Sequence, residues 1–279
     1  MGDRDYFHAE FGGAPRGSFF AQYRGTKFLI IGLVACSVLM AILYQASYDA
    51  FVAVDSALAL RPQDVVSGWI WQLITYAGLH KPVIMHLLWN CLYIWFFGRL
   101  VENRLTTKQY LAFCAGAVVL GGIAFVVVGV IAGSTTACIG ASAACMALLV
   151  LAALWYPTME VSIWGVIRVH LWVIAAVMVI IDLLNALYDS GGVAYTAHLG
   201  GAAYGWIYFK WGGRIEGVFS GIDAMAEKSA QKKERKSRAR DSDLRKEIDR
   251  ILDKVNREGM TALTDEERKF LKSASKKLG

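Results

Sequence analysis

Proline is scarce in this chain, with only four among 279 residues. Since proline interrupts helices, its scarcity leaves room for long, unbroken ones. Hydrophobic residues make up 56% of the chain and the mean hydropathy is +0.42, values that are unusual for a soluble domain. The composition therefore predicts an all-α, polytopic membrane protein and argues against a water-soluble globular domain.

Paired cysteines are lacking as well. None of the five cysteines forms a Cys-x-x-Cys pair, and four of them lie inside apolar runs. Cysteines in such surroundings behave as small buried hydrophobes. We therefore predict no disulfide framework, no metal site and no cofactor.

Positive charge is concentrated in one place. The net charge of +6 comes mainly from the run Lys228 to Arg240, which holds seven Lys or Arg residues and one Glu. Such a run can bind nucleic acid, but beside a membrane segment it more often faces the cytosol and contacts anionic lipid. We predict contact with anionic lipid and no nucleic-acid partner.

Six apolar stretches have the character of membrane helices. Arg16, Arg24 and Lys27 precede the first, which places the N-terminus in the cytosol by the positive-inside rule. Six spans return the C-terminus to the cytosol, where the same rule independently places the basic run. The predicted spans are residues 28–44, 83–100, 110–132, 142–156, 166–187 and 194–211.

The polar segments predict four parts of the chain. Residues 1–26 lack the zones of a cleavable signal peptide and form a cytosolic segment. The six spans occupy residues 27–214, a basic linker follows at 215–241, and residues 242–279 form a cytosolic helical hairpin. Between the first two spans, the tryptophan-rich residues 45–81 predict an amphipathic element at the outer interface.

The fourth span is too short to cross a bilayer. Its fifteen residues, 142–156, rise about 22 Å, against a hydrocarbon thickness of about 30 Å. It must start below the outer surface, so the irregular residues 133–140 before it lie at membrane depth. Such backbone is tolerated only when it is buried in protein or lines a water-filled cavity. We expect a wet cavity with Ser142 at its floor.

Four polar side chains share one depth in the predicted bundle. Counted from the cytosolic ends of the three inward-running spans, Ser142, His198, His86 and Asn90 lie about 13 to 21 Å above the cytosolic interface. Each alone has an ordinary explanation, such as a helix cap or a hydrogen bond between helices. Polar residues in spans are costly and gather on functional cavities, so their common depth favours one site.

These residue types fit acyl transfer. Ser142 is the candidate nucleophile and needs an adjacent base, for which His198 is the candidate. The Ser142 backbone amide, His86 and Asn90 are candidate donors to an oxyanion. Asp182 in the fifth span is a candidate third member, but a helix-to-helix hydrogen bond explains a lone intramembrane acid better.

Small residues allow the helices that carry this site to approach closely. Gly201 and Gly205 lie one turn apart on the span of His198, and Gly140 and Ala143 lie beside Ser142.

Three motifs occur in a characteristic order: His86-x-x-x-Asn90, Gly140-Ala141-Ser142 and Ala197-His198-x-x-Gly201-x-x-x-Gly205. With them, about residues 25–215 resemble the bacterial rhomboid intramembrane serine proteases. The resemblance implies a Ser142/His198 dyad without a third acid, an oxyanion site from His86, Asn90 and the Ser142 amide, and a bacterial inner-membrane location. It also implies that the substrates are transmembrane proteins, cut near the outer face.

Two positions depart from the family pattern. Ala143 stands where the family usually has glycine, and Met146 stands where it often has an aromatic residue. The extra methyl group can crowd the oxyanion site, and Met146 can pack less firmly on His198 than a ring does. A rhomboid-like protein that binds or escorts membrane clients without cutting them is therefore an alternative, although Ser142 and His198 are both retained.

A transporter or metal carrier that uses the histidines is a further alternative. It would need a convergent set of carboxylates or thiolates beside His80 and His86, and the sequence shows none.

Overall fold

The computed structural model describes residues 22–80, 84–163, 166–188, 193–259, 263, 264, 266 and 270. Two compact units divide the chain, Met1–Ile215 and Glu216–Gly279. The prediction of an all-α membrane architecture is confirmed: the described residues form helices, apart from loops and one pair of short strands. The predicted N-terminal segment 1–26 lies outside the described residues as far as residue 21.

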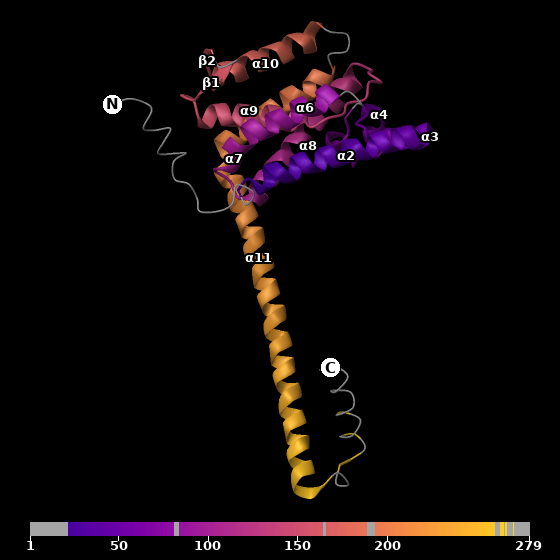
Figure 1. Cartoon of the computed structure of the whole chain (residues 1–279), viewed down its shortest axis with the longest axis vertical. Coiled ribbons are helices and arrows are strands. Elements are labelled where there is room, and N and C mark those ends of the chain that lie inside the picture. Colours follow the sequence, from indigo (N-terminus) through magenta and orange to yellow (C-terminus); the bar gives the residue numbers. More distant parts are fainter. Residues whose placement is uncertain are drawn as a thin grey trace, which may run out of the picture. The chain divides into compact units, whose positions relative to one another are not determined.

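The helices of the first unit follow the predicted spans (Figure 1). Four stretches, residues 24–46, 84–102, 107–131 and 171–188, are long and apolar enough to cross a membrane, and one shorter apolar helix accompanies them. The helices that overlap with the predicted spans are α2 (Arg24–Ala46), α6 (Ile84–Tyr93), the π-helical turn η2 (Ile94–Gly98), α7 (Arg99–Glu102), α8 (Thr107–Ile131), α9 (Ser142–Trp155), α10 (Leu171–Tyr188) and α11 (Val193–Glu258).

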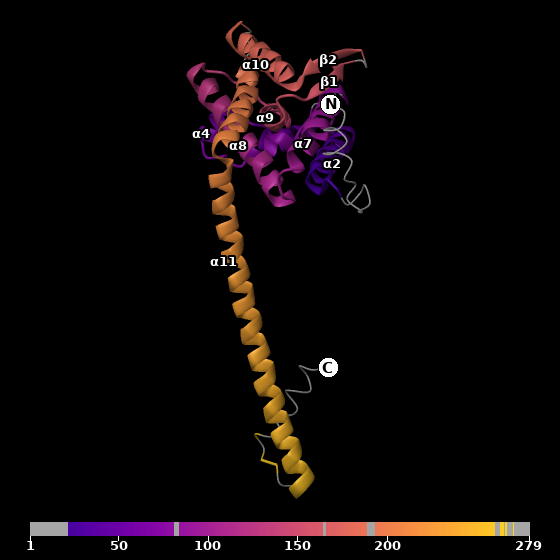
Figure 2. The ribbon, with the colours of Figure 1, turned by 90° about the vertical axis from the view of Figure 1, so that its left-hand side faces the viewer.

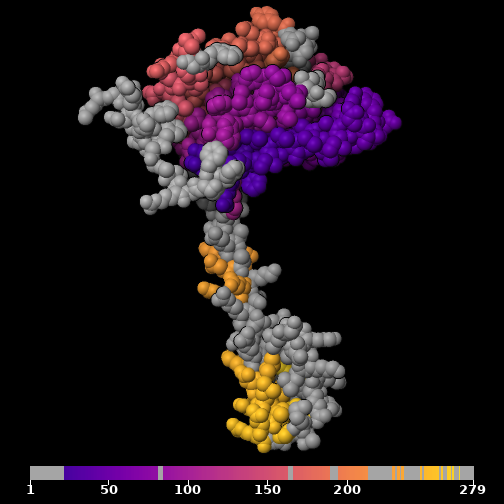
Figure 3. Space-filling view, viewed as in Figure 1, coloured from indigo at the N-terminus to yellow at the C-terminus, as the bar shows by residue number. Residues whose placement is uncertain are grey.

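Large apolar side chains are exposed on the outer helices, as expected where lipid rather than water is the solvent. Figure 3 shows one such face, with α2 in indigo and α6 in magenta. The exposed side chains of this kind on α2, α6 and α10 include Phe28, Ile31, Leu39, Ile42, Ile84, Trp89, Trp172 and Leu187.

The start of helix α2 is held by a carboxylate from the end of α7. The buried side chain of Glu102 accepts hydrogen bonds from the backbone amides of Gly25 at 2.6 Å and Thr26 at 2.9 Å. Free N–H groups at a helix start and the positive end of the helix dipole both favour such a carboxylate. Glu102 thereby joins the first and second predicted spans.

The fifth predicted span is wrong at its start. Residues 166–170 do not begin a helix, because β1 (Glu160–Ile163) pairs antiparallel with β2 (Ile167–His170), and α10 begins only at Leu171. Mean hydropathy counted these residues as apolar. Their β-branched residues alternate with polar ones, which is the pattern of a strand.

Helix α9 lies in the core of the first unit. Ten of its fourteen residues are buried, and it contacts α8, α10 and η2. Helix α11 packs closely on it, as predicted from the glycines (Figure 2). A Cβ at Gly205 would lie 2.6 Å from the carbonyl oxygen of Ala147, and one at Gly201 would collide with that of Ala143.

The predicted interfacial element is a series of short helices. They are α3 (Tyr48–Leu58), α4 (Pro62–Val66), α5 (Gln72–Thr75) and the 3-10 turn η1 (Tyr76–Gly78).

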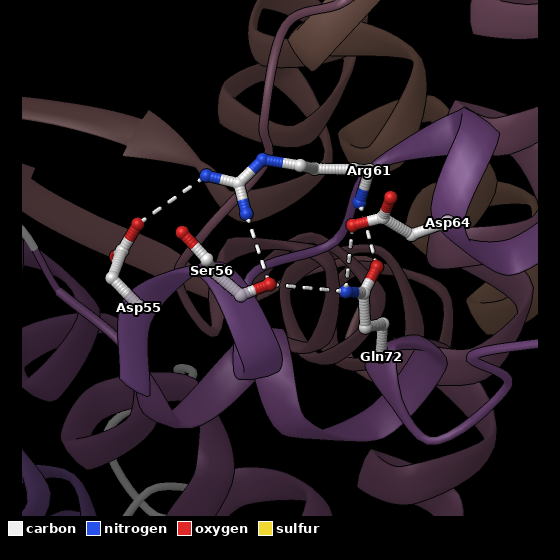
Figure 4. A network of polar contacts seen from close by, with 5 residues as sticks. All are labelled: Asp55, Ser56, Arg61, Asp64 and Gln72. Carbon is white, nitrogen blue, oxygen red and sulfur yellow. Dashed lines mark hydrogen bonds and ion pairs between the residues drawn. The ribbon is translucent and has the colours of Figure 1, made fainter. Parts of the chain in front are cut away.

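A polar network joins these short helices (Figure 4). The Arg61 guanidinium donates to the Ser56 carbonyl oxygen at 3.0 Å and lies 3.5 Å from the Asp55 carboxylate. The Arg61 backbone amide donates to the Gln72 side chain at 3.0 Å, and Gln72 in turn donates to Asp64 at 3.1 Å. The network fixes the chain on both sides of Leu60, whose own backbone pairs with another segment of the chain.

The irregular segment before α9 is held by this interfacial region. The backbones of Leu60 and Cys138 exchange two hydrogen bonds of 2.9 and 3.0 Å, and the Gly140 amide donates to the Tyr76 carbonyl oxygen at 2.9 Å. Leu60, Cys138 and Tyr76 are all buried. The irregular backbone predicted to lie at membrane depth thus has protein partners at these positions, one of the two situations in which such backbone is tolerated.

The second unit consists mainly of the continuation of α11. This helix runs through the residues predicted as a basic linker, 215–241, and ends before Gly259, whose φ of 84° is in the left-handed region. Ile251 and Leu263 are buried on either side of that end. Most of the second helix predicted for the hairpin 242–279 lies outside the described residues.

Candidate active site

Ser142 is the first residue of α9. The cap position belongs to Ala141, which makes no side-chain cap hydrogen bond, so the serine does not serve as the helix cap. Gly140 has a φ of 111°, where a side chain is strained, and a Cβ there would lie 2.7 Å from Nε2 of His86. The backbone turn that presents Ser142 therefore requires glycine at 140.

The Ser142 hydroxyl contacts His198, which lies in the second turn of α11. The distance from Ser142 Oγ to His198 Nε2 is 2.8 Å, well within hydrogen-bonding range. Both residues are half-buried rather than sealed off. The close packing of α11 on α9 at Gly201 makes this contact possible, because helices with small residues at the interface bring their backbones together.

The other nitrogen of His198 contacts Asp182 of α10. Nδ1 lies 3.1 Å from one carboxylate oxygen and 3.2 Å from the other, and the Asp182 side chain is almost completely buried. Asp182 thus makes the expected hydrogen bond between helices, and the residue that it contacts is the candidate base. The structure thus differs from the dyad without an acid that the resemblance implies.

A count along the chain would have found this contact. Asp182 lies six residues before the end of α10 at Tyr188, and His198 lies five residues after the start of α11 at Val193. Two helices joined by a short link place such residues at the same height. Within α10, only Leu171, Ala175 and Asp182 are buried, so the acid lies on the stripe that faces the protein.

His86 and Asn90 of α6 converge on the backbone just before Ser142. From a Cβ built on Gly140, Nε2 of His86 would be 2.7 Å away and Nδ2 of Asn90 would be 3.6 Å away. The first backbone amides of α9 have no carbonyl partner within the helix. The side-chain donors of His86 and Asn90 therefore lie close to the backbone that leads into the first turn of α9.

His80, for which the sequence suggested a role only in a metal site, holds the Asn90 amide in place. Nε2 of His80 lies 3.0 Å from Nδ2 of Asn90, while the Cys145 thiol donates to Oδ1 of Asn90 at 3.3 Å. Burial and the nearby charge of His86 lower the pKa of His80 to about 4. A neutral His80 accepts the Asn90 hydrogen bond, which fixes the orientation of the amide.

The two residues that depart from the family pattern are both buried. The Ala143 methyl group packs against α8, where a Cβ at Gly121 would lie only 2.6 Å from it. Gly121 therefore provides the space that the extra methyl needs. Met146 lies one turn after Ser142 in the core.

A metal site does not emerge from the histidines. The rings of His80 and His86 are 5.0 Å apart between centroids. Among the residues that the structure describes, no three His, Cys, Asp or Glu side chains gather as a metal site requires.

Comparison with known families covers both units. A model described as Rhomboid domain matches residues 67–214, which is 148 of the 279 residues and includes every residue placed around Ser142 above. A second model, described as a family of unknown function (DUF6576), matches residues 229–277. No curated protein matches the sequence.

Proposed function

Because the chain belongs to the rhomboid family, we propose that it is an intramembrane serine endopeptidase that cleaves transmembrane proteins near the outer membrane face. The observation that carries this proposal is the 2.8 Å contact between Ser142 Oγ and His198 Nε2. A serine hydroxyl is a poor nucleophile unless a base lies within hydrogen-bonding reach. Here the base comes from a different helix, and the packing of α11 on α9 sets its position.

In the first half of the reaction, Nε2 of His198 removes the proton from the Ser142 hydroxyl. Ser142 Oγ forms a bond to the carbonyl carbon of the scissile peptide, and the electron pair of the C=O bond moves to the oxygen. The Ser142 amide, His86 and Asn90 are the donors for that oxyanion. His86 and Asn90 both lie close to Gly140, two residues before the nucleophile.

Collapse of the oxyanion breaks the peptide C–N bond, and the departing amine takes the proton from His198. The remaining acyl group is an ester on Ser142. His198 then removes a proton from water, whose oxygen attacks the ester and releases the acid product and the free serine. Protons pass only among Ser142, His198, water and the leaving amine, so no cofactor is needed.

The membrane arrangement belongs to the same proposal. The protein lies in a bacterial inner membrane with both termini in the cytosol, and residues 228–240 contact anionic lipid. The run contains seven basic residues. It also lies on α11, the same helix that contains the sixth predicted span, and basic residues next to a span favour the cytosolic side and anionic lipid.

The test uses the full-length protein in detergent or liposomes, a fluorophosphonate probe and a transmembrane test substrate. We expect the parent to be labelled and to cleave, and Ser142→Ala to do neither. Ser67→Ala is a matched control, since Ser67 is an exposed serine that donates only to a backbone carbonyl. A folded parent that neither labels nor cleaves contradicts the protease proposal and favours a client-binding protein. Cleavage that survives Ser142→Ala contradicts the choice of nucleophile.

A further inference from the structure

We propose that Asp182 is a positioning residue that orients His198 and stabilises its positive charge, so that the site works as a Ser142–His198–Asp182 triad. This inference rests on the proposed protease function. The inference adds a third residue to the proposed Ser142–His198 pair. That residue comes from α10, a helix that carries none of the other site residues described above.

The three side chains form a line of contacts with His198 in the middle. His198 lies between Ser142 Oγ, 2.8 Å from Nε2, and the Asp182 carboxylate, 3.1 Å from Nδ1. The side chain of His198 is 28% exposed, whereas that of Asp182 is 5% exposed. The acid thus lies behind the histidine, and the reacting serine lies on the more accessible side.

Asp182 decides which nitrogen of His198 carries the proton. A neutral imidazole has one N–H donor and one acceptor nitrogen, and an ionised carboxylate only accepts. With Asp182 against Nδ1, the proton resides on Nδ1 and the lone pair of Nε2 points at the Ser142 hydroxyl. The other tautomer would place an N–H where the base must accept a proton.

Asp182 also supplies charge where the reaction needs it. When the Ser142 proton moves to Nε2, His198 becomes an imidazolium. A carboxylate fixed beside it, away from water, stabilises that cation without any rearrangement. Asp182 accepts no proton in this scheme, so the proton balance of the reaction is unchanged.

The cost of placing an acid here argues that it has a use. Asp182 lies on the buried stripe of α10 with Leu171 and Ala175, and an unpaired charge inside a membrane protein is expensive. Of the described titratable groups, His198 contacts it directly, and Tyr93 of α6 interacts with it electrostatically. A purely structural tie between α10 and α11 predicts a loss of stability without a loss of turnover, whereas a positioning role predicts the reverse.

The kinetic test compares Asp182→Asn, Asp182→Ala and Asp182→Glu with the parent in liposomes. For a positioning role we expect Asp182→Asn to lower kcat by about 10²- to 10⁴-fold, with KM and melting temperature close to those of the parent. Asp182→Glu should recover part of the loss, because it restores a carboxylate. Asn185→Ala on the same helix is the matched control and should retain the parent's kcat. A lower melting temperature with kcat retained overturns the positioning role.

The spectroscopic test does not depend on turnover. In protein with ¹⁵N-labelled histidine, nuclear magnetic resonance should show His198 of the parent protonated on Nδ1, and Asp182→Ala should shift protonation toward Nε2. An unchanged tautomer in Asp182→Ala overturns the proposal. The two proposals fail differently: an inactive parent contradicts the protease function itself, whereas an active parent with an equally active Asp182→Asn variant contradicts only the role of Asp182.

Discussion

The two sides of Ser142 share one plan but differ in charge. On the base side (His198 and Asp182), a histidine contacts the serine and a buried residue on another helix lies behind it at 3.1 Å. On the oxyanion side (His86, Asn90 and His80), an asparagine lies near the serine and a buried residue from the interfacial region holds it at 3.0 Å. The supporting residue is a carboxylate on the base side and a neutral imidazole on the oxyanion side.

This difference matches the charges that the proposed reaction creates. The base becomes positive when it takes the serine proton, so a carboxylate behind it is favourable. The substrate oxygen becomes negative, and a carboxylate behind its donors would oppose it. Burial keeps His80 neutral instead, so that it orients Asn90 without adding a negative charge.

The largest effect is expected from breaking the base side. We predict that His198→Ala lowers kcat by about 10⁴-fold or more, because it removes the base that lies 2.8 Å from the serine hydroxyl. Cleavage of a transmembrane test substrate in liposomes measures it. His170→Ala, which changes a histidine of β2 that lies 3.9 Å from Glu160, should retain parental activity. Near-parental cleavage by His198→Ala would remove His198 from the mechanism.

The next largest effect is expected on the oxyanion side. We predict that Asn90→Ala lowers kcat by about 10²- to 10³-fold through loss of one donor. Asn90→Asp should be more damaging, since it places a negative charge beside the oxyanion. The comparison of the two variants is made at equal amounts of folded protein. An Asn90→Asp variant as active as Asn90→Ala would show that charge on this side is unimportant.

A smaller effect follows from separating α11 from α9. In Gly201→Ala the new methyl group collides with the Ala143 carbonyl oxygen, and we predict a loss of about 1–3 kcal/mol in stability. Thermal unfolding in detergent measures it. Gly32→Ala is the matched control, because a Cβ at Gly32 of α2 meets nothing within 4 Å. Equal melting temperatures for both variants would contradict the packing described for α11.

The smallest effect concerns the pH dependence of the oxyanion side. His80 has a pKa of about 4 in the folded protein and about 6.5 when unfolded. Between these values the unfolded state binds more protons, so stability falls as the pH is lowered from 6.5 toward 4. We predict a loss of about 1 kcal/mol between pH 7 and 5.5. His80→Gln keeps an acceptor for Asn90 but cannot titrate, and its unfolding curves should lack this part of the slope.

Most of the fold was predictable from the sequence, because a helix that crosses lipid must be apolar over most of its length. Each described helix that is long and apolar enough to cross a membrane was predicted, as was the short helix that begins at Ser142. The error at residues 166–170 arose because hydropathy measures how apolar a stretch is and not its period. A test for alternation would have separated β2 from α10.

The candidate site was predicted unevenly for a related reason. Ser142, His198, His86 and Asn90 were predicted to share a depth by counting along spans of like predicted direction. Asp182 lies on a span of opposite direction, and only a count from the α10–α11 connection places it beside His198. His80 lies before the first turn of α6, where no helical count applies.

The motifs along the chain were enough to identify its family. The order of apolar and polar residues was enough to predict a helical membrane bundle with four polar side chains at one depth, because the length of an apolar run and the rise of a helix are local properties. Rotation of each helix about its axis depends instead on which side chains fill the space between neighbours. That packing turns Asp182 toward His198, directs the Ala143 methyl group at Gly121, and closes the distance from Ser142 Oγ to His198 Nε2 to 2.8 Å.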